Sequence, residues 1–108
     1  MNKNAAFHEY VVHDLLVDVP HISSRAMFGG YGIYKDGNIF AIIVDGDLYL
    51  KATDETKTFF AERGSHAFTY AKKNGKSYTM NYWFVPEEVL EDREAFSKWI
   101  DVIMSVSR

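Results

Sequence analysis

Histidines near the N-terminus are the first residues of this sequence whose types suggest chemistry. In the segment HEYVVH, residues 8–13, two histidines enclose a glutamate, as in the helical zinc motif of metalloproteases. That motif spaces its histidines four apart, which places both on one helix face. His8 and His13 are five apart, so on a helix they point about 140° away from each other. Nothing in the spacing requires His21 to join either one, and we expect no metal site.

The sequence gives equally little support for catalysis by a serine or by paired carboxylates. Ser65 and His66 are adjacent, so in a strand they point to opposite faces and cannot relay a proton. The chain has no cysteine and no GxSxG motif. A cluster of acidic residues lies near the C-terminus: Glu87, Glu88, Glu91, Asp92 and Glu94. We interpret these charges as complementing the dipole of a helix N-terminus. Acid–base catalysis in a cleft is the alternative. We predict a protein that is not an enzyme, with no catalytic residues and no cofactor.

Basic residues gather around one predicted turn and form our candidate patch for an anionic partner: Arg63, Lys72, Lys73 and Lys76. Such residues usually form a solvated sheet edge that discourages stacking. The formal net charge of the chain is −3, whereas nucleic-acid binding favours a basic surface. We therefore expect no direct nucleic-acid binding. The alternative is a nucleic-acid-associated factor that binds through this patch.

Three turn signals and three helix patterns organise the chain. Apolar residues at helical spacing predict a first helix over 4–18, which Pro20 ends. Asp-Gly or Asn-Gly pairs at 36–37, 45–46 and 74–75 are typical of two-residue hairpin turns. The strands they join are expected at 27–35, 38–44, 47–52, 67–73 and 76–84.

The remaining segments predict helices between and after these strands. Thr53 or Asp54 can begin a helix that Gly64 ends, and Asp92 can cap the last helix. We predict one domain over 1–108, of the α+β class. It has two layers, with a five-stranded antiparallel sheet in the order α-β(3)-α-β(2)-α.

The glycines of the segment FGGYG, residues 28–32, raise the question of a phosphate loop. The pattern matches neither GxGxxG nor GxxxxGK, and a hairpin follows instead of a helix. Counting back from the turn at 36–37 pairs Ile33 with Phe40 and places Gly30 and Gly32 on the helix-covered face. We interpret these glycines as room for close sheet–helix packing. A backbone bulge or a close approach to a partner is the alternative.

The same counting collects large aromatic side chains on the opposite face of the sheet. In the second hairpin it pairs Ala71 with Tyr78, Thr69 with Met80 and Ala67 with Tyr82. The resulting candidate interaction face consists of Tyr31, Phe40, Tyr49, Phe68, Tyr70 and Trp83. Either a helix covers these rings, or a second subunit or partner does, or single-stranded bases stack on them. We favour a homodimer, because two-fold pairing is the commonest way to bury such a surface.

Two features of the sequence bear on the location of the protein: its first ten residues and its longest apolar run. The first ten residues, MNKNAAFHEY, lack a signal-peptide pattern, and the run 39–44 is far too short to span a bilayer. We expect a cytoplasmic protein without membrane attachment.

Three segments together carry a family resemblance: RAMFGGYGIYKDG at 25–37, LYLKATDET at 48–56 and NYWFVPEEVLED at 81–92. They resemble, in order, the N-terminal domain of the TfoX/Sxy competence-regulator family, over roughly residues 5–104. The resemblance implies an α-β(3)-α-β(2)-α fold. It also implies a role in regulating natural transformation, alongside the cyclic-AMP receptor protein at competence promoters.

The resemblance implies neither catalytic nor ligand-binding residues. Full-length members usually carry a second, helical domain, which a chain ending at Arg108 is expected to lack. Our leading hypothesis is a non-enzymatic regulatory domain that binds a protein partner in a transcription complex. The alternatives are a nucleic-acid-associated factor that binds through the basic turn, and a small-molecule-binding domain.

Overall fold

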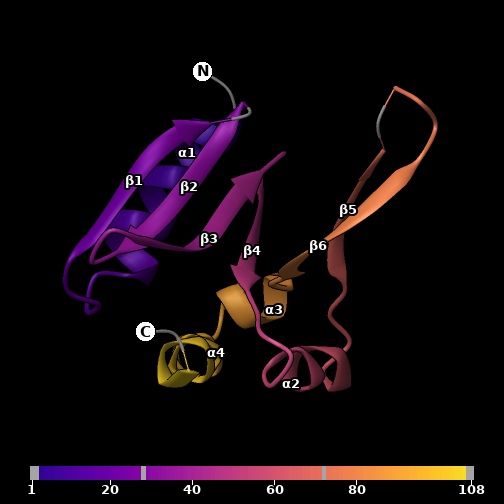
Figure 1. Cartoon of the computed structure of the whole chain (residues 1–108). Helices are drawn as coiled ribbons and strands as arrows, with labels where there is room; N and C mark the ends of the chain where they lie inside the picture. The colour runs from indigo at the N-terminus through magenta and orange to yellow at the C-terminus, as the bar shows by residue number, and fades with distance from the viewer. Residues whose placement is uncertain (1–2, 28, 72, 107–108) are drawn as a thin grey trace.

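The computed structural model describes residues 3–27, 29–71 and 73–106 and consists of a single antiparallel sheet with helices on one face (Figure 1). The sheet has six strands in the order β1-β2-β3-β4-β6-β5. Their bounds are β1 Ile22–Met27, β2 Gly30–Lys35, β3 Asn38–Val44, β4 Asp47–Lys51, β5 Ala67–Ala71 and β6 Ser77–Phe84. The helices are α1 Lys3–Tyr10, the π-helical η1 Val11–Leu15, α2 Lys57–Glu62, α3 Glu87–Leu90 and α4 Arg93–Val106. The predicted α+β class is confirmed, but the predicted number of strands is wrong.

The additional strand, β1, lies before the strand that we predicted over 27–35, and the first residues of that predicted strand belong to the turn between β1 and β2. The chain reverses around Gly29, whose φ is +74°, and Met27 pairs with Gly30. Four of the six residues of β1 are exposed, because it is an edge strand with polar side chains. That composition lacks the apolar alternation by which a strand is recognised in a sequence.

Two of the three predicted turns have the expected geometry. Asp36 and Gly37 have φ of 52° and 82°, and Asp45 and Gly46 have φ of 52° and 80°, as two-residue turns of this kind require. At the third, Gly75 has a φ of 84°, while Asn74 is not left-handed. Asn74 instead accepts a hydrogen bond from the Lys76 amide through its side chain, at 3.0 Å. Ala71 therefore pairs with Ser77 across a longer loop, and the predicted two-residue turn is wrong.

Helix ends follow the local signals. Asp92 accepts bonds from the amides of Glu94 and Ala95 at 3.1 and 3.2 Å, which confirms it as the cap of α4. Gly64, with a φ of +79°, follows α2 as predicted. The first helix changes to π-helical hydrogen bonding, as in the 2.9 Å bond from the Leu16 amide to the Val11 carbonyl.

The main core lies between the helices and one face of the sheet. Phe60, Phe96, Trp99 and Ile103 from the helices pack on strand residues that include Ile33, Ala41, Ile43, Leu48 and Leu50. A second apolar cluster contains strand residues alone: Ile42, Tyr49 and Tyr82 are buried in it, with Ile39, Val44, Phe68 and Phe84 beside them. The face that carries this second cluster is called the open face below, and none of the helices in the described ranges covers it. None of the helices described is both long enough and apolar enough to cross a bilayer.

Candidate interaction surface

A β-bulge decides which residues reach the open face. Tyr31 pairs with Ile43 and Ile33 with Ala41, and the register then shifts between Ile33 and Tyr34. β3 therefore has one extra residue, Phe40, at the bulge. Relative to the predicted register, this reverses the face of the sheet on which the side chains of residues 30–33 lie. Our predicted pairing of Ile33 with Phe40 is wrong, and so is the placement of Gly30 and Gly32 under a helix.

The two glycines instead lie on the open face, where they give room to neighbouring strands. A Cβ on Gly30 would lie 1.9 Å from the backbone oxygen of Ile43. A Cβ on Gly32 would lie 2.8 Å from the Met27 side chain and 3.1 Å from that of Ile39. These glycines therefore give room for close packing as predicted, but the neighbours are strands of the same sheet and not a helix.

Three members of the predicted aromatic face lie on the helix side. Phe40 is 3% exposed in the main core. Tyr31 stacks on His8 of α1, with ring centroids 4.0 Å apart and planes 9° from parallel. Trp83 lies against Phe60 of α2 at 6.5 Å. Of the coverings that we considered from the sequence, a helix therefore covers these three rings.

The other three members lie together on the open face. Tyr49 contacts Phe68 edge-on at 5.0 Å, and Phe68 is followed by Tyr70 at 6.1 Å. Tyr70 in turn stacks on Tyr78 at 5.8 Å. A continuous row of rings therefore crosses from β4 to the edge of the sheet.

This row borders an open apolar groove of about 440 Å³. The groove is lined by Ile39, Ile42, Val44, Phe68, Tyr70, Met80 and Tyr82. Burial raises the pKa of Tyr82, with a smaller contribution from Tyr34, and burial followed by Asp47 and Asp45 raises the pKa of Tyr49. Both phenols are thus neutral hydrogen-bonding groups at physiological pH, and the groove suits an apolar surface with a few polar contacts.

Sequence reasoning missed Met80 and Tyr82 because the second hairpin is also shifted from the expected register. Thr69 pairs with Thr79 and Tyr70 with Tyr78, so the even-numbered residues of β6 face the groove. No residue-type signal marks this shift, since it depends on the length of the loop at 72–76.

The predicted basic patch does not form one cluster. The Arg63 guanidinium lies 3.7 Å from the Phe59 ring centroid and donates to the Phe59 carbonyl at 2.9 Å, so it closes the end of α2. Lys73 and Lys76 are exposed at the far end of the β5–β6 hairpin from α2 (Figure 1). Lys72 lies outside the described residues.

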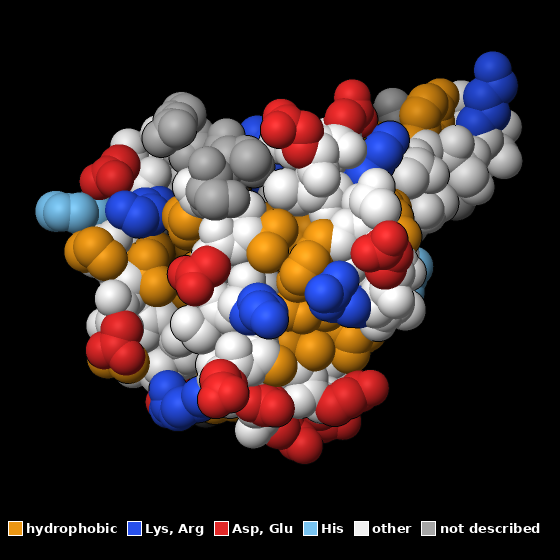
Figure 2. Space-filling model, turned by 90° about the horizontal axis from the view of Figure 1, so that it is seen from below, with side chains coloured by type: hydrophobic (Ala, Val, Ile, Leu, Met, Phe, Trp, Pro, Cys, Tyr) orange, Lys and Arg blue, Asp and Glu red, His pale blue; other side chains and the backbone are white. Residues whose placement is uncertain are grey.

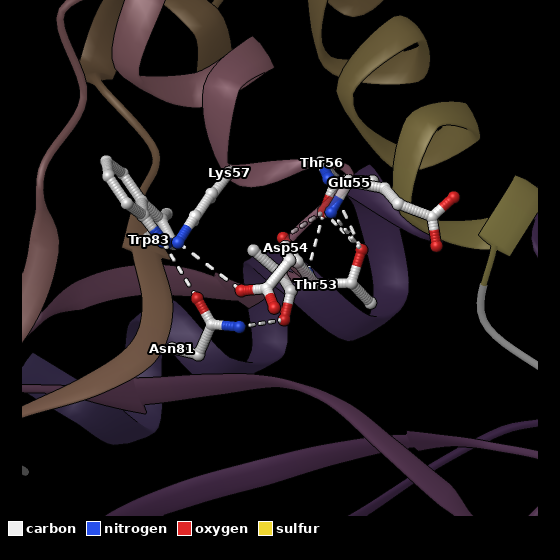
Figure 3. Close-up of polar contacts among 8 residues, drawn as sticks. Thr53, Asp54, Glu55, Thr56, Lys57, Asn81 and Trp83 are labelled. Carbon is white, nitrogen blue, oxygen red and sulfur yellow. Dashed lines mark hydrogen bonds and ion pairs between the residues drawn. The ribbon is translucent and has the colours of Figure 1, made fainter.

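Polar contacts join the connection between β4 and α2 to β6 (Figure 3). Asn81 donates to the Ala52 carbonyl at 2.5 Å and accepts the Trp83 indole N–H at 3.2 Å. The buried Thr56 hydroxyl accepts the Thr53 amide at 2.8 Å. Together these bonds tie β6, which carries the groove residues Met80 and Tyr82, to the segment that leads into α2.

Candidate catalytic and metal residues are not brought together. Ser65 donates to the Phe84 carbonyl at 2.5 Å, while His66 stacks on the Phe84 ring at 4.9 Å. His8 contacts the Ser24 hydroxyl at 2.7 Å, and His13 pairs with Glu9 at 3.3 Å. Within the ranges that the structure describes, no three histidine or acidic side chains form a group that could hold a metal.

Comparison with known proteins assigns this architecture to a family. Residues 14–106 match the TfoX N-terminal domain. The chain belongs to the TfoX N-terminal domain family. The segments that carried the resemblance are the β1–β2 hairpin, the β4–α2 connection and the strand that leads from Asn81 into α3.

Two characterised relatives share part of this TfoX N-terminal domain. Protein Sxy of Escherichia coli (strain K12) is 34% identical over 80 residues, 74% of this chain and 38% of Sxy. The DNA transformation protein TfoX1 of Aliivibrio fischeri (strain ATCC 700601 / ES114) is 35% identical over 65 residues, 60% of this chain and 31% of TfoX1. The chain therefore matches less than two fifths of either relative's length.

Proposed function

We propose that this protein is a non-enzymatic, protein-binding regulatory domain that takes part in the control of DNA uptake, and that the open face is its binding surface. The observation that carries the proposal is the groove, whose wall residues Tyr70 and Met80 are 37% and 36% exposed. Large, partly exposed apolar side chains around a concave surface are typical of protein-binding sites. Family membership and the name of TfoX1 support the biological context.

The test is a competence-gene reporter in a strain that lacks the native protein. Tyr70→Asp together with Met80→Asp places charge in the groove, and we expect the reporter response to fall to the level of the empty strain. Val17→Asp is the matched control, because Val17 is 60% exposed and lies outside the groove. A full response from the groove variant, at equal protein level, would overturn the proposal.

The alternative is a nucleic-acid-associated factor, and the observation that favours it is the pair of exposed lysines at the end of the β5–β6 hairpin. A gel-shift titration on a competence promoter separates the two, with and without the cyclic-AMP receptor protein and over a range of salt. Direct binding that weakens steeply with salt and is lost in Lys73→Ala with Lys76→Ala supports the alternative. Binding that requires the receptor protein supports the proposal.

A further inference from the structure

The β5–β6 hairpin extends beyond the sheet as an arm with few contacts of its own. β5 is an edge strand that pairs only with β6, and β6 pairs with β4 only at residues 82–84. All residues from Ser77 to Asn81 are exposed. Figure 2 shows the arm projecting past the body of the molecule, with basic side chains at its end. An isolated two-stranded ribbon is marginally stable in water, so further packing would stabilise it.

The arm also has a charge opposite to that of the body. Residues 67–84, the hairpin itself, contain three of the twelve basic residues and none of the fifteen acidic ones. The rest of the chain then has nine basic and fifteen acidic residues, a net charge of −6. Complementary charge of this kind steers association and favours one relative orientation of the partners.

The unpaired charges lie at opposite ends of the open face. β4 runs antiparallel to β6, with Tyr49 opposite Phe84 and Lys51 opposite Tyr82. The arm therefore extends past the Lys51 end of β4, away from the turn at Asp45–Gly46. Among the described residues, Asp45 and Asp47 have no ion-pair partner, and neither do Lys73 and Lys76 at the tip of the arm.

We propose that a second copy of this chain occupies the groove, with the arm of each copy lying across the open face of the other. A two-fold axis perpendicular to the strands would bring the lysines of one arm tip over Asp45 and Asp47 of the other copy. The same axis would set the apolar side chains of each arm, Tyr70 and Met80, against the other groove, as a self-complementary interface requires. This inference rests on the proposed role of the open face as a binding surface, and it names the partner.

A charge-exchange experiment tests the orientation. One variant reverses the arm tip, Lys73→Glu with Lys76→Glu; the other reverses the opposite end, Asp45→Asn with Asp47→Lys. Asparagine at 45 retains the left-handed turn, whose φ there is 52°. Sedimentation equilibrium at about 50 mM salt, where surface charges are weakly screened, should show a wild-type dimer. Each variant alone should have a Kd about tenfold weaker, the effect of several exposed ion pairs replaced by repulsions.

The decisive sample is an equal mixture of the two variants. Each arm in the mixed pair meets a surface of opposite charge, so the mixture should recover a Kd close to that of the wild type. Tyr70→Ser and Met80→Ser should weaken the dimer at every salt concentration, whereas Val17→Ser should not. A monomeric wild type, or a mixture no tighter than its components, would overturn the proposal. So would a monomer that binds a single-stranded oligonucleotide through Lys73 and Lys76.

The outcomes separate this inference from the proposed function. A monomer whose groove variants still lose the reporter response would overturn the dimer alone. A dimer whose groove variants keep the full reporter response would overturn the regulatory role alone.

Discussion

The imidazole of His8 lies flat on the ring of Tyr31, with the two planes 9° from parallel and the centroids 4.0 Å apart. Its Nε2 is also 2.7 Å from the Ser24 hydroxyl. This one side chain therefore connects α1 to both strands of the β1–β2 hairpin. The contact covers the tyrosine ring on the side of the sheet to which the β2–β3 register directs it.

Protonation of His8 should weaken this contact. Burial lowers the pKa of His8 below 6.5, with an opposing effect from Glu9 and a smaller lowering effect from His13. The unfolded chain then binds more protons than the folded one between the lowered pKa and 6.5, so the free energy of unfolding rises with pH in that window. We expect urea midpoints to fall as the pH decreases below 6.5. His8→Phe should show a smaller fall; an unchanged slope would contradict the assignment.

The two glycines of β2 should respond differently to a single methyl group. Gly30→Ala should cost about 3 kcal/mol, because the new Cβ meets a backbone oxygen 1.9 Å away. Gly32→Ala should cost about 1 kcal/mol, since the nearest atom, at 2.8 Å, is the end of the flexible Met27 side chain. Thermal unfolding of both variants measures the difference. Equal losses would show that the strand spacing around Gly30 relaxes freely.

Phe40 and Tyr70 are two members of the aromatic face predicted from the sequence. Their replacement by alanine should lower the free energy of unfolding by very different amounts. Phe40→Ala removes a ring that is 3% exposed and should cost about 3–5 kcal/mol. Tyr70→Ala removes one that is 37% exposed and should cost about 1 kcal/mol or less in the monomer. Urea unfolding at low protein concentration provides the comparison. A large loss at Tyr70 under those conditions would mean that the arm packs within its own chain.

The bonds of Asn81 should contribute measurably to stability. Asn81→Ala leaves the carbonyl of buried Ala52 without its 2.5 Å donor and the Trp83 indole without its acceptor. We expect a loss of about 1–2 kcal/mol. Ser77→Ala, at an exposed position of the same strand, is the control and should change stability by less than about 0.5 kcal/mol. Similar values for the two variants would show that water replaces the asparagine.

Local signals in the sequence determined much of the architecture. The left-handed turns at Gly37 and Gly46, the cap at Asp92 and the end of α2 at Gly64 each depend on the conformational preference of one or two residues. The family resemblance, which depends on the order of three segments, is confirmed as well. These features were accessible because their causes lie within a few residues of each other.

The composition of the open face was decided only by the tertiary structure. One bulge at Phe40 and one longer loop before Ser77 shift the register, and a shift of one residue transfers a whole strand's side chains to the other face. The register of the second hairpin depends on the length of its loop, since Ala71 pairs with Ser77. The bulge has no local sequence signal, because the register of β2 on β3 is selected by how well the helices bury Ile33, Ala41 and Ile43 together. For the same reason β1, whose exposed residues contribute little to that core, was recognisable as a strand only through its pairing with β2.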